Sequence, residues 1–249
     1  MERYSRGRLV FRPFSNLYFF VLLLWLMIIL PFAVLFLRDL LLRDLGLPPE
    51  MVCGLLLLSL FGSFVNIPLT ELRSRAPMFT YREVAFFGVT WHVPRMEMGT
   101  RKTLVTLNIG GALVPLLIST YILAYAIPQG DPDPLLAYGK VLFVLAVVTL
   151  VVNRLSRIVK GFGIATPAFV PPAITVLATL LVYWVGATSS PTLIAYVGGT
   201  LGTLVGADLL NIRHLPRLGA PVVSIGGAGT FDGIYTTGLV SVLLVLLLL

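Results

Sequence analysis

Two aspartates, Asp208 and Asp232, are the residues whose setting predicts chemistry. Each lies well inside an apolar stretch, whereas Asp39, Asp44 and Asp131 lie in short polar connections where water solvates the charge. An acidic side chain at membrane depth costs ~2.5 to 3.5 kcal/mol unless it is neutral, paired or solvated. Two carboxyl groups that share a desolvated site do not both ionise readily, so one holds a proton while the other acts as a base on water. Such a pair can hydrolyse a peptide bond, because the protonated acid polarises the scissile carbonyl.

The composition indicates that membrane helices position these acids. The 249 residues are 57% hydrophobic and 12% charged, with a mean hydropathy of +0.96, which excludes an ordinary soluble globular domain. We expect an all-α membrane protein with a single polytopic domain, residues 1–249, and seven helices. The expected spans of ~20 apolar residues are 17–37, 51–70, 103–127, 138–152, 169–186, 192–212 and a last one that ends at residue 249.

The basic residues predict the orientation of these helices. All Lys and Arg residues except Arg38, Arg43 and Lys140 fall in the N-terminal arm or in alternate connections. Lys and Arg are retained on the cytoplasmic side of short loops, so we expect the N-terminus inside and the C-terminus outside, in a prokaryotic plasma membrane. The net charge of +7 is assigned to this topology and to contacts with anionic membrane lipid rather than to nucleic acid.

The connection 71–102 between the second and third expected helices is the one sizeable segment predicted outside the membrane. Aromatic and β-branched residues surround Gly88 in the run VAFFGVTWHV. This pattern favours a small β-like cytoplasmic insertion, either a hairpin or an interfacial flap.

A weak internal repeat relates two parts of the chain. Its copies follow the second and sixth expected helices, which run in the same direction, so the repeat is parallel rather than inverted. Only the second copy carries the acids, so the first copy would have a structural role. The alternative is that there is no repeat, because small-residue motifs recur by chance in Gly-rich membrane helices. The shared features are Asn66-Ile67 with Asn211-Ile212, Ser63 opposite Asp208, Leu116 opposite Asp232, and the run IGGA at 109–112 and 225–228.

Helix geometry places the two acids at the same end of the bundle. Asp208 precedes the expected end of its helix by four residues, which is ~6 Å at ~1.5 Å per residue. The run SIGGAG disfavours helix because each Gly costs ~1 kcal/mol, so regular helix is expected to start near Thr230, just before Asp232. Two adjacent antiparallel helices would then each carry one carboxyl group at the cytoplasmic end.

This pattern resembles the presenilin and signal-peptide-peptidase family of aspartyl intramembrane proteases. GADLL around Asp208 is similar to the family's first motif, and GGAGTFDGI around Asp232 to its Gly-x-Gly-Asp motif, although Thr230 and Phe231 stand between the last glycine and the acid. The resemblance implies an intramembrane aspartyl endopeptidase, with Asp208 and Asp232 as catalytic residues and a transmembrane helix as substrate. Over most of its length the chain also resembles a prokaryotic family of membrane proteins of unknown function, through NIPL, NIGGA, GIATPAFVPP, GADLLN and GGAGTFDGI.

Further residues are expected to bind substrate or line a cavity beside the acids. Prolines in GFGIATPAFVPPAI break helical hydrogen bonding, so the fifth helix is expected to start after Pro172, with the approach to it lining the cavity. No metal or cofactor is expected, because the sequence has two histidines and one cysteine without ligand spacing. The expected binding or cavity-lining residues are Gly226, Gly227, Gly229, Asn66, Pro68, Asn108, Pro167 and Asn211.

Two other readings of the acids stay open. In a proton- or cation-coupled transporter or channel, the same acids bind the ion and the run SIGGAG supplies exposed carbonyls. In a non-catalytic membrane scaffold, the acids are a satisfied polar pair or bind Arg213 or Arg217, and Asp232 caps a helix N-terminus. The glycines that would then serve close helix packing are Gly198, Gly199, Gly202 and Gly206.

Overall fold

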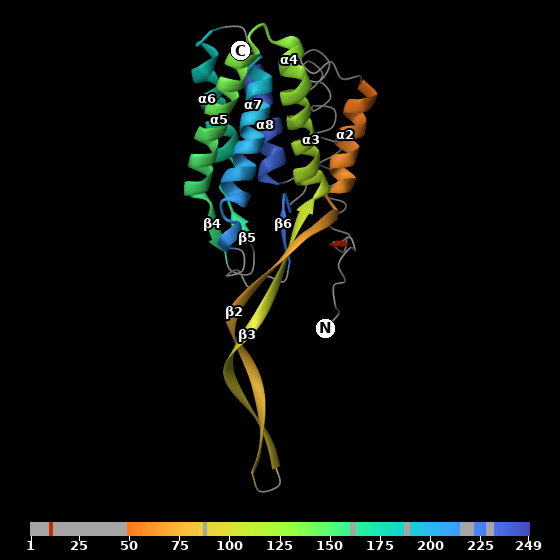
Figure 1. The fold of residues 1–249 in the computed structure, drawn as a ribbon, viewed down its shortest axis with the longest axis vertical. Helices are drawn as coiled ribbons and strands as arrows, with labels where there is room; N and C mark the ends of the chain where they lie inside the picture. Colours follow the sequence, from red (N-terminus) through yellow and green to blue (C-terminus); the bar gives the residue numbers. More distant parts are fainter. Residues whose placement is uncertain are drawn as a thin grey trace.

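The computed structural model describes most of the chain as a helical bundle with a long hairpin at one end (Figure 1). The first expected span, 17–37, and the glycine at position 229 lie outside the described residues. The structure describes residues 10–11, 49–86, 89–159, 163–186, 190–214, 222–227 and 232–249.

Helices that alternate in direction form the bundle (Figure 1). Within the described part of the chain, three helical stretches are long and apolar enough to cross a membrane, namely Ile109–Gly130, Pro134–Leu155 and Pro191–His214. Val170–Tyr183 and Gly233–Leu248 are shorter apolar helices. The chain is therefore a membrane protein that is mostly helical. The elements are α2 (Pro49–Gly62), η2 (Ile109–Leu113), α3 (Val114–Tyr121), η3 (Ile122–Ala126), α4 (Ile127–Gly130), α5 (Pro134–Leu155), α6 (Val170–Tyr183), α7 (Pro191–Thr203), η4 (Leu204–Leu209) and α8 (Gly233–Leu248).

Prolines and acids mark where several helices begin. The Asp133 carboxylate accepts from the Leu136 N–H at 3.1 Å and caps α5, whose first residue is Pro134. Helix α6 begins at Val170, with Pro171 and Pro172 in its first turn, three residues before the start expected after Pro172. Prolines fit there because the first N–H groups of a helix have no intrahelical partner.

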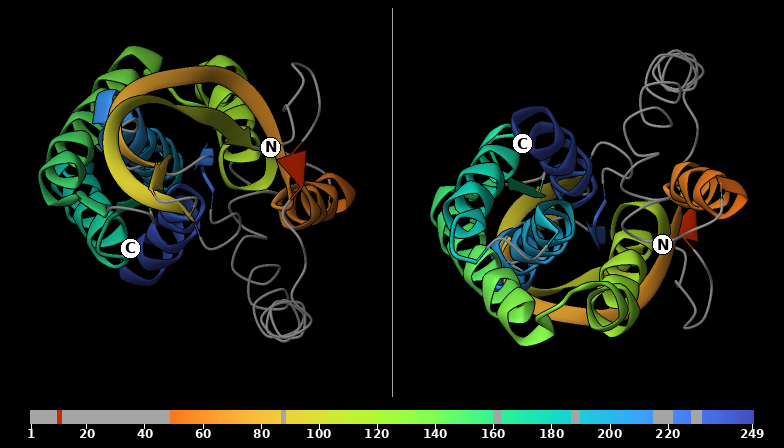
Figure 2. Two further views of the ribbon diagram at one scale, coloured as in Figure 1. Left: turned by 90° about the horizontal axis from the view of Figure 1, so that it is seen from below. Right: turned by 90° about the horizontal axis from the view of Figure 1, so that it is seen from above.

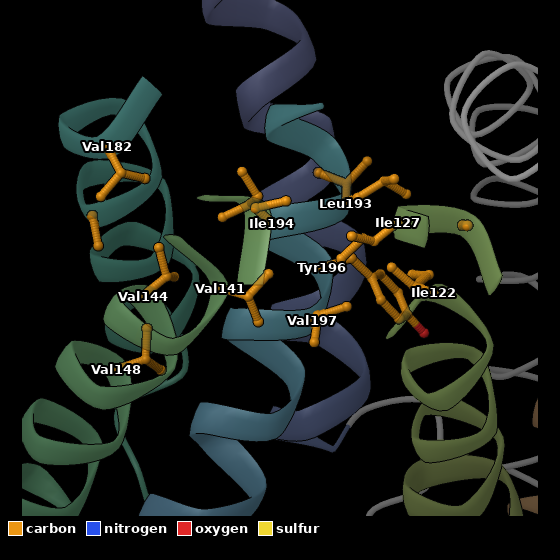
Figure 3. Close-up of a cluster of buried hydrophobic side chains, with 14 of the residues drawn as sticks. Ile122, Ile127, Val141, Val144, Val148, Val182, Leu193, Ile194, Tyr196 and Val197 are labelled. Atoms are coloured by element: carbon orange, nitrogen blue, oxygen red, sulfur yellow. The ribbon is translucent and has the colours of Figure 1, made fainter. Parts of the chain in front are cut away.

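Helix α7 is the centre of the bundle. It contacts α3, α5, α6 and α8 and is surrounded by them when the bundle is seen along its axis (Figure 2). Its residues 192–200 are all buried. Figure 3 shows the apolar side chains that meet around it, among them Val141, Val144 and Val148 of α5 and Val197 of α7.

Glycines bring α5 against α7. A Cβ on Gly198 would lie 2.6 Å from Val144 Cγ1, and one on Gly202 would lie 2.8 Å from Val148 Cβ. The same spacing continues to Gly206, which faces Thr149 and Val152. Lipid tails are as apolar as these side chains, so membrane helices associate through close contact of this kind. This is the close helix packing that the scaffold alternative assigned to Gly198, Gly202 and Gly206.

Two long antiparallel strands, β2 (Val65–Phe86) and β3 (Val89–Asn108), form a hairpin that projects away from the bundle (Figure 1). At ~3.3 Å per residue each strand is ~70 Å long. A short strand, β1 (Val10–Phe11), pairs with β2, and β6 (Val222–Ile225) pairs with β3 in parallel, which gives the order β1-β2-β3-β6. Separately, β4 (Arg157–Val159) pairs with β5 (Gly163–Ala165).

The hairpin is longer than the expected insertion 71–102, because both strands continue toward the bundle. Residues 65–70 and 103–108, which the sequence assigned to helix ends, are strand. The run TLVTLN is rich in β-branched residues, which suit strands, and Val105 pairs with Val223 of β6. Pro68 lies at a shift in register between β2 and β3, where a residue without an N–H is tolerated.

Candidate functional site

The two IGGA runs meet at the end of the bundle nearest the hairpin. The first follows β3 and begins η2, and the second ends β6 and turns through Gly226 and Gly227 toward α8. Gly226 has a φ of 67°, and a Cβ placed there would lie 2.6 Å from Ala112 Cβ and 2.7 Å from Ala112 N. Both the backbone conformation and the contact require glycine.

The Asn66 side chain ties the two turns together. Its Oδ1 accepts from Asn108 Nδ2 at 3.1 Å and from Ser224 Oγ at 2.6 Å. Asn108 and Ser224 each immediately precede an IGGA run. Asn108 also donates from Nδ2 to the Ser63 carbonyl at 2.7 Å and accepts from the Gly111 N–H at 2.8 Å. These buried amides fix where β3 and β6 end relative to each other.

A widened helical turn positions Asp208. Here α7 continues as the π-helical segment η4, in which the Leu210 N–H donates to the Val205 carbonyl at 3.0 Å. The Gly206 carbonyl accepts from Asn153 Nδ2 at 3.1 Å and from Asn211 Nδ2 at 3.2 Å. Segments of this kind interrupt α-helices mostly as single turns, frequently at functional sites.

Asp208 and Asp232 both lie at this end of the bundle. Asp208 Oδ2 accepts from the Gly226 N–H at 3.4 Å, a long hydrogen bond, and Asp232 Oδ2 accepts from the Ile234 N–H at 3.0 Å as the N-cap of α8. The two carboxyl groups lie within range of each other's charge. Among the residues that the structure describes, no Lys or Arg forms an ion pair with Asp208.

Comparison with known proteins identifies the family but not an activity. A family model described as a protein of unknown function, DUF1614, matches residues 60–244, well over half of the chain. The chain belongs to the DUF1614 family. No curated protein and no solved structure matches it. The expected membership of a family of unknown function is confirmed, whereas the comparisons return no presenilin-like protease.

The DUF1614 match covers both aspartates, both IGGA runs and the hairpin.

Gly227 lies in the turn beside Ser224, whose carbonyl would be 2.7 Å from a Cβ on this glycine. Asn211 donates to carbonyls of its own helix end, including that of Ala207 at 2.9 Å. The expected site residues that the structure brings to the meeting point of the two turns are Asp208, Asn66, Asn108, Gly226 and Gly227.

Other expected site residues lie apart from the acids in this DUF1614 chain. Pro68 belongs to β2 and has its own role at the register shift. Pro167 is exposed on the loop before α6, and its carbonyl accepts from the Val170 N–H at 3.1 Å. Arg213, one of the two expected partners of the acids, is exposed, and Arg217 lies outside the described residues.

Ser59 and Tyr235 are residues of the site that the sequence did not single out. Ser59 of α2 is 1% exposed and donates to the Gly110 carbonyl at 2.7 Å. Tyr235, three residues after Asp232, lies near the Ser59 side chain. Helix periodicity offers a signal for Tyr235, because a residue three positions after an N-terminal acid lies near it on the helix surface.

Proposed function

We propose that this membrane protein crosses a prokaryotic plasma membrane seven times, with the end that carries Asp208 in the cytoplasm. The exposed basic residues Arg154, Arg157 and Arg213 belong to that end, together with the base of the hairpin. Lys140, near the opposite end, is buried and donates to the Gly186 carbonyl at 2.5 Å. This distribution agrees with retention of basic residues on the cytoplasmic side. The outward-facing apolar residues that would contact lipid include Leu142, Phe143, Leu150, Leu177 and Leu181.

We propose that Asp208 and Asp232 are the catalytic pair of an intramembrane aspartyl endopeptidase. The observation that carries this proposal is that two antiparallel helices bring their carboxyl groups within charge interaction range, with no described basic partner for Asp208. Like charges in a desolvated site favour a shared proton over two ionised groups. A pair in that state offers one general base and one general acid together.

In the proposed reaction the ionised carboxylate removes a proton from water, and the water oxygen attacks the carbonyl carbon of the scissile peptide bond. The protonated carboxyl group donates its proton to the carbonyl oxygen, which gives a neutral tetrahedral intermediate. When the C–N bond breaks, the leaving nitrogen takes the proton that the first carboxylate removed from water. One hydroxyl of the intermediate returns its proton to the second carboxylate, which leaves a carboxylic acid, an amine and a pair that again shares one proton. The substrate is a transmembrane segment that enters from lipid and unwinds at the cytoplasmic end of the bundle.

The surrounding groups orient this pair in the proposed enzyme. The Gly226 N–H donates to Asp208, and the cap of α8 fixes Asp232. Asn66 fixes β6, which precedes the turn. Rigid support of this kind matters because a small misplacement of catalytic groups lowers the rate strongly.

Cleavage assays with Asp208→Asn and Asp232→Asn test the proposal. The full chain is reconstituted in liposomes with a panel of single-span membrane proteins, and cleavage is followed by mass spectrometry. Each variant should lose at least ~10²-fold in rate, because an amide cannot exchange the proton. Asn caps helices as well as Asp does, which serves position 232, and its side-chain oxygen can still accept from the Gly226 N–H at position 208, so both variants should fold.

Asp133→Asn is the matched control, because Asp133 also caps a helix with its carboxylate but lies on α5. It should cleave at the wild-type rate. Cleavage by both single variants at the wild-type rate would exclude the dyad. Loss of thermal stability in step with loss of activity would instead assign the acids to the fold, as in a membrane scaffold.

A proton- or cation-coupled transporter is the second candidate. One observation favours it: the acids stand at an interrupted helix end and beside a Gly-rich turn, and transport sites are commonly built at interrupted helices. Two results together would favour the transporter over the protease. The liposomes would show ion-dependent uptake that needs both acids, and none of the single-span membrane proteins of the panel would be cleaved.

A further inference from the structure

A row of buried polar side chains runs along α7 from one end of the bundle to the other. Thr192, Tyr196, Thr200 and Thr203 are at most 5% exposed. At ~100° per residue they occupy an arc of roughly 80° on the helix surface. Gly198 and Gly202 face α5, so this polar row lies on a different side of α7.

The π-helical segment brings Asp208 onto the same side. In a regular α-helix, five residues after Thr203 would be rotated by roughly 140° from it. A π turn bonds residue i to residue i+5, so residues five apart lie nearly above each other. The polar row therefore ends at Asp208.

Helix α8 contributes hydroxyl groups to the same row. Thr203 Oγ1 donates to Thr237 Oγ1 at 3.3 Å. The Thr200 hydroxyl lies over Gly238, where a Cβ would be only 2.5 Å from Thr200 Oγ1. Ser241 donates to the Gly238 carbonyl at 3.2 Å, one turn further from the acids.

None of the residues that the structure describes is a hydrogen-bond partner of the Thr200 hydroxyl. A threonine in a helix usually satisfies its hydroxyl by donating to a carbonyl one turn earlier, as Thr175 does with Pro171 at 2.7 Å and Thr237 with Gly233. Thr200 makes no such bond although it is 1% exposed, and neither does Ser119 of α3, the helix that contacts α7 and α8. Buried polar groups without a protein partner commonly bind ordered water.

We infer that Thr192, Tyr196, Thr200 and Thr203 of α7, with Thr237 of α8, line a file of internal water that carries protons between the far end of the bundle and Asp208. Each water accepts a proton from one neighbour and passes one to the next, so no oxidant or other reactant is needed. At the far end, Ser190 hydrogen-bonds with Thr192 at 2.7 Å and is partly exposed. The file would supply protons to Asp208 whether the acids cleave a peptide or bind an ion, so it rests on neither proposed function.

Proton flux into liposomes tests the inference without any substrate. The full chain is reconstituted with a pH-sensitive dye inside, and a potassium diffusion potential drives proton uptake. The wild type should exceed protein-free liposomes, and Thr200→Val should fall to their level because valine has the same shape without the hydroxyl. Thr200→Ser, which restores the hydroxyl, should recover the flux even if the valine variant folds poorly.

Thr175→Val is the matched control. Thr175 is fully buried, and its hydroxyl already bonds within α6, so this variant should conduct like the wild type. The inference is overturned if the wild type conducts no more than protein-free liposomes, if Thr200→Val conducts normally, if Thr200→Ser also loses the flux, or if Thr175→Val loses as much as Thr200→Val.

Discussion

Replacing Gly226 with alanine should destabilise the protein at the meeting point of the two turns. The residue has a φ of 67°, a conformation that costs an L-residue with a Cβ roughly 1–2 kcal/mol. The added Cβ would also lie 2.6 Å from Ala112 Cβ and 2.7 Å from Ala112 N. Overpacking a close contact costs about 1–3 kcal/mol, so the two effects give a loss of about 2–5 kcal/mol, provided that they add.

The free energy of unfolding in detergent micelles, from denaturant titration, measures this loss. Gly139→Ala is the control, because Gly139 lies on an exposed face of α5 and a Cβ there meets nothing within 4 Å. Alanine at this helical position should stabilise the protein by up to about 1 kcal/mol. A Gly226→Ala variant as stable as the wild type would refute the reasoning, because it would show that the turn moves freely relative to Ala112.

Two further predictions concern the bundle. Gly202→Ala should lower the free energy of unfolding by about 1–3 kcal/mol, because its Cβ would lie 2.8 Å from Val148 Cβ. Combining it with Val148→Ala should cost less than the sum of the two single changes. Strict additivity in this double-mutant cycle would count against direct contact between the two residues. Lys140→Met should lower the free energy of unfolding by about 1–3 kcal/mol, because the Gly186 carbonyl loses its hydrogen bond to the charged ammonium group. Unchanged stability in the same titration would show that this carbonyl finds another partner.

Hydropathy and glycine spacing were sufficient to predict most of the helical bundle. The positions of α5 and α7 follow from apolar length, and the packing role of Gly198 and Gly202 follows from small residues four apart. The cap formed by Asp232 also follows locally, since an acid after a Gly-rich turn is a common helix start. Each of these features depends on residues near one another in the sequence.

The strands at the base of the hairpin depend on a distant partner. The run 103–108 is short and apolar enough to continue a helix, and periodicity alone does not separate a buried strand from a helix at this length. Its conformation depends on pairing on both sides, with β2 and with β6, and β6 lies more than a hundred residues later in the chain, where Ser224 lies opposite Thr106. The widened turn at Asp208 is also hard to predict, because one of the two amides that donate to the Gly206 carbonyl, that of Asn153, comes from α5.

The two copies of the internal repeat hold their turns with different side chains. In the first copy, the Asn108 carboxamide accepts from the Gly111 N–H and donates to the Ser63 carbonyl. In the second, Asp208, which aligns with Ser63, accepts from the Gly226 N–H. An amide both donates and accepts, so it can join two backbone groups without a charge. A carboxylate can only accept unless it is protonated, so the second copy holds its turn with a group that can also exchange a proton.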